Sequence, residues 1–200
     1  DALCHQVWNG QMYNGRPASE VGSDTKATSL NIDAAQNGIV TRGVLLDIAK
    51  LKGKKWLDAG EPVFVEDLEA AEKAAGVRIE EGDALMLRLG WYKRRLEEGP
   101  PTSGRPGLHA ETLPWLRERG VSIVSGDASQ DVDPSGYPKL GLPVHKVGIV
   151  GMGLWLIDAA NCEELVQVCE RLNRWEFMFN VAPLRFKNAT GSPVNPLALF

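Results

Sequence analysis

Histidine and cysteine are both scarce in this sequence, which holds three residues of each among 200. Three cysteines are too few for a disulfide scaffold in a chain of this length. They are typical of a reducing compartment, so we expect a cytoplasmic protein. Metal or acid–base chemistry that needs an imidazole can draw only on His5, His109 or His145.

Long apolar runs and an excess of positive charge are also missing. No run approaches the roughly 18 apolar residues of a membrane span. With 22 Lys and Arg against 26 Asp and Glu, the formal net charge is -4, which gives no basic surface for nucleic acid or anionic lipid. The glycines form no G-x-G-x-x-G or Walker pattern for phosphate binding. We therefore expect neither nucleic acid nor a membrane as a partner.

Predicted helices and strands alternate along the chain, which favours one α/β domain over residues 1–200. Several predicted strands are continuous apolar runs, so helices should cover much of the sheet. The first 37 residues are polar and rich in Gly and Asn, and we interpret them as loop. The predicted strands are residues 38–48, 84–89, 121–124 and 175–186, and the predicted helices are residues 66–75, 91–98, 109–119 and 161–172.

Asp1 and His5 form a D-x-x-x-H pair at the start of the chain. On a helix these positions share a face, where a carboxylate and an imidazole can share a metal ion or a proton. The spacing alone is also compatible with a solvated terminal Asp.

Trp8 and Tyr13 lie close to His5 in the same irregular segment, and either aromatic side chain could line a pocket for a flat ligand.

His145 and Asp158 are a second candidate pair, thirteen residues apart. Fully extended, that segment would span about 43 Å and would keep the two side chains apart. A short helix from Lys146, ended by the glycines that follow, and a returning strand over residues 154–157 could bring them together. The alternative interpretation is that Asp158 caps the next helix.

Six short segments occur in an order and spacing that resemble one protein family, the putative cyclases, which include bacterial kynurenine formamidase and isatin hydrolase. The resemblance covers nearly the whole chain. It is carried by residues 41–47 (TRGVLLD), 82–88 (GDALMLR), 115–121 (WLRERGV), 126–131 (GDASQD), 143–145 (PVH) and 191–196 (GSPVNP).

The resemblance implies roles for four residues. The family signature is H-x-G-T-H-x-D-x-x-x-H, and the segment from Asp1 to His5 is similar to its last part. Asp1 would then be a metal ligand and His5 the acid–base residue. The two leading histidines would precede residue 1, so we expect a cyclase-like domain without its N-terminal segment. In some members a later family histidine and a Glu complete a second metal position. His145 matches that histidine, and Asp158 falls where the Glu is expected, after a one-residue shift, so both would also be metal ligands.

The resemblance also implies a fold and an activity. The expected fold is of the swivelling β/β/α type, with a mixed sheet flanked by helices, assembled as a homodimer or homotetramer. The expected activity is hydrolysis of a formamide, cyclic amide or lactone-like substrate, in which Zn²⁺ or Mn²⁺ activates water and His5 transfers the proton.

Two other functions stay open at this point. The chain could be a non-catalytic member of the family, because the leading histidines are missing and Asp158 replaces Glu. It could also be a small-molecule binding module that uses Trp8, Tyr13 and neighbouring loops, in which case ligand binding would survive removal of all metal.

Overall fold

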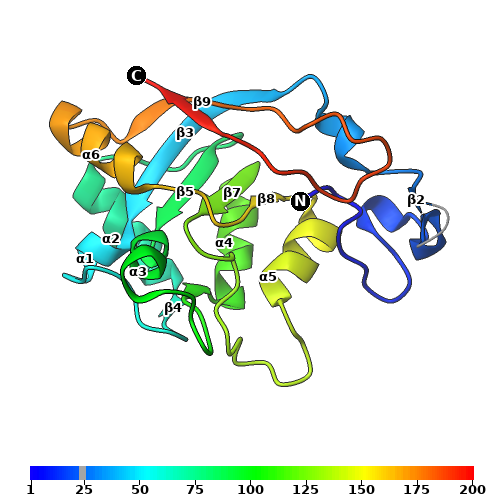
Figure 1. The fold of residues 1–200 in the computed structure, drawn as a ribbon, viewed down its shortest axis with the longest axis horizontal. Coiled ribbons are helices and arrows are strands. Elements are labelled where there is room, and N and C mark those ends of the chain that lie inside the picture. The colour runs from blue at the N-terminus through cyan, green and yellow to red at the C-terminus, as the bar shows by residue number, and fades with distance from the viewer. Residues whose placement is uncertain (23–25) are drawn as a thin grey trace.

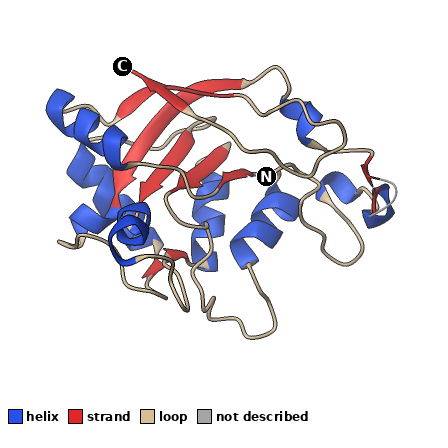
Figure 2. Ribbon diagram, in the orientation of Figure 1, coloured by secondary structure: helices blue, strands red, loops and turns tan. Residues whose placement is uncertain are grey.

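A mixed six-stranded sheet forms the centre of the computed structural model, which describes residues 1–22 and 26–200 (Figures 1 and 2). The strand order is β10-β9-β3-β5-β7-β8. Strands β3, β5, β7 and β8 are parallel, whereas β9 runs antiparallel to β3 and to β10. The strands are β3 (Ile39–Asp47), β5 (Ala84–Arg88), β7 (Ile123–Gly126), β8 (Trp155–Ile157), β9 (Glu176–Val181) and β10 (Leu197–Leu199).

Helices cover both faces of this sheet, and β5 shows how the sequence produces that arrangement. All five β5 residues are buried. Leu85 and Leu87 pack into one apolar cluster, with side chains from α2 (Val65–Ala75) and α4 (Leu113–Glu118). Ala84 and Met86 point the other way, into a cluster with α6 (Glu163–Leu172). Since successive side chains of a strand alternate between faces, a strand buried on both faces must be apolar throughout.

The predicted α/β alternation is confirmed, with shifts at several boundaries. Helix α3 (Trp91–Glu98) has the predicted bounds, and α2 ends as expected where Gly76 adopts a left-handed φ of 67°. Strand β7 begins two residues later than predicted, at Ile123, which pairs with Ala84, the first residue of β5. Helix α6 also begins two residues later, and the Asn161 side chain accepts a hydrogen bond from the Glu163 amide.

The predicted strand over residues 175–186 is shorter in the structure, where β9 ends at Val181. Pro183 follows shortly afterwards and has no N–H with which to continue a ladder. The remaining short elements are α1 (Ile48–Leu51), β4 (Pro62–Val63), which pairs with β6 (Gly107–Leu108), and η4 (Ala110–Thr112).

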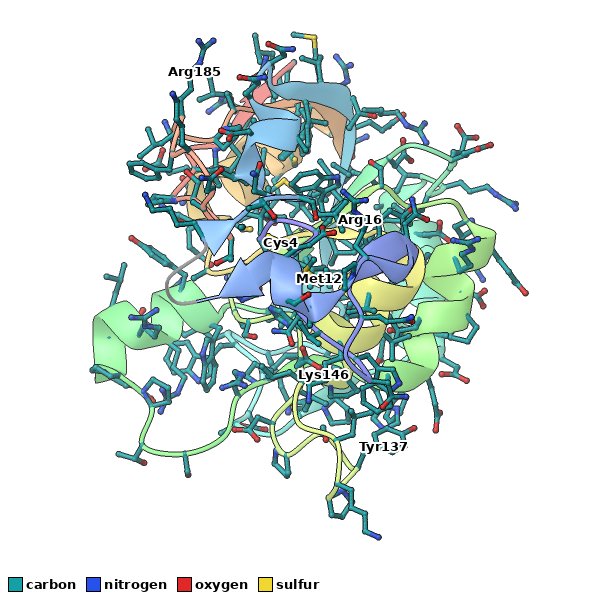
Figure 3. The ribbon with its side chains drawn as sticks, turned by 90° about the vertical axis from the view of Figure 1, so that its right-hand side faces the viewer. Cys4, Met12, Arg16, Tyr137, Lys146 and Arg185 are labelled. Atoms are coloured by element: carbon teal, nitrogen blue, oxygen red, sulfur yellow. The ribbon has the colours of Figure 1, made fainter. Side chains whose placement is uncertain are left out.

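The N-terminal segment, interpreted as loop, holds short 3₁₀ turns and a small core of its own. Ala2, Cys4 and Met12 are buried in it with residues from the following turns. The Ala2 amide donates to the Thr190 carbonyl at 3.0 Å, which ties the segment to the C-terminal loop. Figure 3 views the molecule from this side, with Cys4 and Met12 labelled. The elements are η1 (Tyr13–Gly15), η2 (Ala18–Glu20), η3 (Ile32–Ala35) and the pair β1 (Val21–Gly22) and β2 (Lys26–Ala27).

The helix predicted from Lys146 is present and has an unusual form. Helix α5 (Pro143–His145) continues as a π-helix, η5 (Lys146–Met152). Gly153 ends it with a left-handed φ of 71°, and the chain then returns as β8. A Cβ atom at Gly153 would lie 2.5 Å from the Tyr13 ring, so the N-terminal segment packs closely on this turn.

Among the helices of the described residues, none is long and apolar enough to cross a membrane. The longest, α2, has 11 residues, and its polar side chains include Glu66 and Asp67 in the first turn.

We predict that Leu85→Ala lowers the free energy of unfolding by about 2–5 kcal/mol, because Leu85 is fully buried and its truncation leaves a cavity. Chemical denaturation measures the loss. Leu96→Ala on α3 is the matched control, since Leu96 is 71% exposed and its truncation should change stability by less than about 0.5 kcal/mol. Equal losses in the two variants would contradict the assigned core.

Candidate metal centre

Three side chains from distant parts of the chain converge at one end of the sheet. The Nε2 atom of His145 lies 3.3 Å from Asp1 Oδ2 and 3.2 Å from Asp158 Oδ2. One ligand atom from each of the three residues lies within 4.8 Å of the others, and this is the group of possible metal ligands found among the described residues. Asp1 of the first candidate pair therefore meets both residues of the second pair in one cluster.

Each of the three residues reaches the cluster by a different local structure. Asp158 follows β8 directly, at the carboxyl end of the strand. His145 lies in the first turn of the helix that precedes β8. The N-terminal amine of Asp1 donates a hydrogen bond of 2.7 Å to the carbonyl of Leu156 in β8, which places Asp1 beside the same strand (Figure 1).

The alternative role for Asp158, as a cap of the next helix, does not fit the structure. The side chain of Asn161, rather than that of Asp158, accepts the backbone amide of Glu163 at the start of α6. Asp158 instead accepts hydrogen bonds from Gln130 and contacts His145.

His145 is almost completely buried, and its ring lies between carboxylates. Burial alone would lower the pKa of His145, but hydrogen bonds to Asp131 and Asp158 outweigh it and raise the pKa to about 9. Burial likewise opposes ionisation of Asp158, but His145 and Gln130 keep its pKa below the usual range. In the metal-free protein the site is therefore a charged imidazolium held by carboxylates.

Two further residues support the cluster, and neither is among the candidate site residues that the sequence predicts. Asp131 Oδ2 lies 2.5 Å from His145 Nδ1, and Gln130 donates to Asp158 Oδ1 from its amide and its side chain, both at 3.2 Å. In the sequence both belong to the segment 126–131, which carries part of the resemblance but indicates no role for either residue. The sequence signal that could identify them is their position. Their segment follows one predicted strand, and Asp158 follows the next predicted strand along the chain.

His5 lies beside the cluster rather than inside it. Its Nε2 is 3.6 Å from Asp1 Oδ1, and its side chain is 38% exposed. The two residues are not on a helix; they approach through a turn in which the His5 amide donates to the Ala2 carbonyl. Partial burial, together with the positive charge of His145, lowers the pKa of His5, so its imidazole is neutral near pH 7.

A cavity of about 430 Å³ adjoins the cluster, with Asp1 and Asp158 in its wall. Its other lining residues are mainly apolar, such as Ile32, Trp155 and Val181. A mainly apolar cavity with a few polar groups at one side is typical of small-molecule sites.

Neither Trp8 nor Tyr13 belongs to the wall of this cavity. Trp8 is 48% exposed, and the ring of Tyr13 packs against Gly153. Their part in substrate binding stays a prediction. His109 lies elsewhere, with its ring centroid 4.8 Å from that of Phe64 and 5.6 Å from that of Tyr137.

The donor atoms of the cluster suit a divalent cation. Two carboxylate oxygens and one imidazole nitrogen are a ligand set used by both Zn²⁺ and Mn²⁺. Asp1 and Asp158 direct carboxylate oxygens at the same imidazole nitrogen, and this concentration of negative charge favours a cation between them.

Comparison with known proteins assigns the chain to one family. The profile of the family described as "Putative cyclase" matches residues 1–133. That match covers more than half of the 200 residues, and the chain belongs to this family. A comparison with curated protein sequences finds no match.

Solved structures agree with this assignment. The chain is similar to a novel cyclase, with a TM-score of 0.89 and 29% identity over 100% of this chain and 68% of that one. It is also similar in fold to an isatin hydrolase bound to thioisatinate (TM-score 0.69, 20% identity, 100% of this chain and 70% of that one). Isatin hydrolase A from Ralstonia solanacearum gives a TM-score of 0.66 at 21% identity, over 99% of this chain and 69% of that one. The expected cyclase-like α/β fold, with its mixed sheet flanked by helices, is confirmed.

We predict that His145 in the metal-free protein stays protonated at pH 7.5 and titrates near pH 9, because Asp131 and Asp158 stabilise its charge. Since its folded-state pKa is above the usual 6.5, this charge stabilises the fold fully below pH 6.5, and the contribution is lost as pH rises through about 9. NMR titration of the imidazole and denaturation at pH 6 and pH 9.5 measure both effects. Asp131→Asn should lower the pKa and reduce the difference in stability, and titration near 6.5 in the wild type would contradict the prediction.

Proposed function

We propose that this chain carries the catalytic site of a metal-dependent hydrolase that opens an amide, either a formamide or a cyclic amide. The observation that carries the proposal is the convergence of Asp1, His145 and Asp158 at the wall of an apolar cavity, with His5 beside Asp1. The proposed ion is Zn²⁺ or Mn²⁺, held by Asp1, His145 and Asp158.

The chemistry that such an ion supplies when bound is to lower the pKa of water and to polarise a carbonyl group. The protein must in addition move a proton, because hydrolysis of an amide takes one from water and gives one to the leaving nitrogen. His5 fits this role, since its pKa is lowered and its neutral imidazole can accept a proton near pH 7.

Asp1 connects the proton-transfer residue with the ligand cluster. Its Oδ1 faces His5 Nε2 and its Oδ2 faces His145 Nε2. A single carboxylate group, that of Asp1, therefore separates His5 from the proposed ion. The exposed fraction of its side chain lets it exchange the proton with solvent after each turnover.

The lining of the cavity favours a small, largely apolar substrate. It is lined by apolar residues, while the polar groups of Asp1 and Asp158 lie in the same wall. Isatin is a cyclic amide, and the fold similarity to isatin hydrolases supports this substrate class for the present chain.

The proposed metal site predicts that His145→Ala and Asp158→Asn weaken binding of Zn²⁺ and Mn²⁺, because each removes a ligand that faces the other two. Equilibrium dialysis of the full chain measures the binding. His109→Ala is the matched control, since it removes a histidine that lies outside the cluster and should bind metal as the wild type does. Similar affinity in all four proteins would refute the assigned ligands.

The proposed role of His5 predicts a different result for His5→Ala. Metal binding should persist, whereas kcat for isatin or a formanilide should fall by about 10²–10⁴-fold, the usual contribution of a positioned acid–base group. Turnover unchanged by the substitution would exclude the role. A wild-type chain that binds metal but turns over neither substrate class would favour a non-catalytic family member, and ligand binding that survives chelation would favour a binding module.

A further inference from the structure

We propose that Gln130 and Asp131 are the positioning residues of this site, which set the direction of its imidazole and carboxylate ligands. The proposal rests on the proposed metal-dependent function. It adds two residues that do not face the cavity and that act through His145 and Asp158. Both belong to the loop that follows β7.

Asp131 accepts three hydrogen bonds, two from His145 and one from the neighbouring Val144. Its side chain is 1% exposed and accepts the Nδ1 proton of His145, with 2.5 Å between the heavy atoms. It also accepts the backbone amides of Val144 at 2.6 Å and His145 at 3.1 Å. These amides lie in the first turn of α5, where the helix itself offers no acceptors. A single carboxylate therefore fixes both the helix that carries His145 and the rotation of its ring.

The contact to Nδ1 has a chemical consequence at the other side of the ring. When Nδ1 carries a proton that is donated to Asp131, neutral His145 has its lone pair on Nε2. That atom faces Asp1 and Asp158. Asp131 thus selects the tautomer that can bind a cation between these carboxylates.

Gln130 fixes the orientation of the Asp158 carboxylate. The backbone and side-chain amides of Gln130 both donate to Asp158 Oδ1 at 3.2 Å, and its side chain also donates to the Ile157 carbonyl at 3.0 Å. With Oδ1 occupied by two donors, Oδ2 is the oxygen presented to His145. Gln130 is 2% exposed, so packing also restrains its side chain.

The supporting loop is itself held against β8 and the residues that follow it, which include Asp158. Strands β7 and β8 are paired, and beyond their ends the Ala159 amide donates to Ala128 and the Ala160 amide to Gly126, at 3.0 and 2.8 Å. Consecutive residues of one loop thus fix two ligands from different elements. Such preorganisation is worth about 10–100-fold in metal affinity in other proteins.

The test compares Gln130→Met and Asp131→Asn with Asp133→Asn. The control removes a carboxylate from the same loop, but the Asp133 side chain is 52% exposed and pairs with Arg105. Binding of Zn²⁺ and Mn²⁺ is measured by equilibrium dialysis, and the bound Mn²⁺ is examined by EPR. We expect both site variants to bind about 10–100-fold more weakly with a changed Mn²⁺ spectrum, and the control to match the wild type.

A purely structural role gives a different result. Denaturation measures the stability of each variant, and Gln130→Met keeps a similar side-chain volume if Asp131→Asn fails to fold. Lower stability with unchanged metal affinity and an unchanged Mn²⁺ spectrum would overturn the proposal.

A metal-free measurement separates this proposal from the proposed function. Imidazole ¹⁵N shifts at a pH well above 9, where the ring is neutral, should show the Nδ1–H tautomer of His145 in the wild type, a mixture in Asp131→Asn, and an altered Nε2 signal in Gln130→Met. If the chain binds neither metal, the proposed function fails while the ¹⁵N shifts still decide the positioning roles. An Nε2–H tautomer in the wild type, or an Nε2 signal unchanged by Gln130→Met, would overturn them.

Discussion

The buried carboxylate of Asp131 joins the loop after β7 to the first turn of α5 and to the ring of His145. Without that contact, two backbone amides and one imidazole nitrogen would be left without their acceptor in the interior of the protein. An unsatisfied buried donor costs about 1–3 kcal/mol, so this carboxylate constrains the helix and the ring together. The position of Nε2, and hence the candidate metal centre, depends on it.

Parallel sheet topology explains why the remaining groups meet at the same place. The carboxyl ends of adjacent parallel strands lie at one edge of a sheet, and this edge is where α/β proteins commonly bind ligands. The loop with Gln130 follows β7, and Asp158 follows its neighbour β8. The π-helix reverses the chain between His145 and β8, so the two ligands approach although thirteen residues separate them.

The charges of the site also have a common physical basis. Asp1, Asp131 and Asp158 all direct carboxylate oxygens at the ring of His145. Such a group of anions is stable only with a positive charge at its centre. A protonated imidazole supplies that charge in the metal-free protein. A divalent cation would supply it in the proposed holoenzyme, and His145 would then bind in its neutral form.

Local sequence patterns determined much of the framework. Apolar runs located β3 and β5, composition and the stop at Gly76 located α2, and glycines after Lys146 indicated the turn that brings Asp158 back to His145. These signals are local, because propensity and capping act over a few residues. The tertiary structure alone decided the register of β7, the contact of Asp1 with His145, and the contacts of Gln130 and Asp131 with the ligand side chains. Those features depend on strand order and on hydrogen bonds between residues far apart in the chain, and no local pattern encodes them.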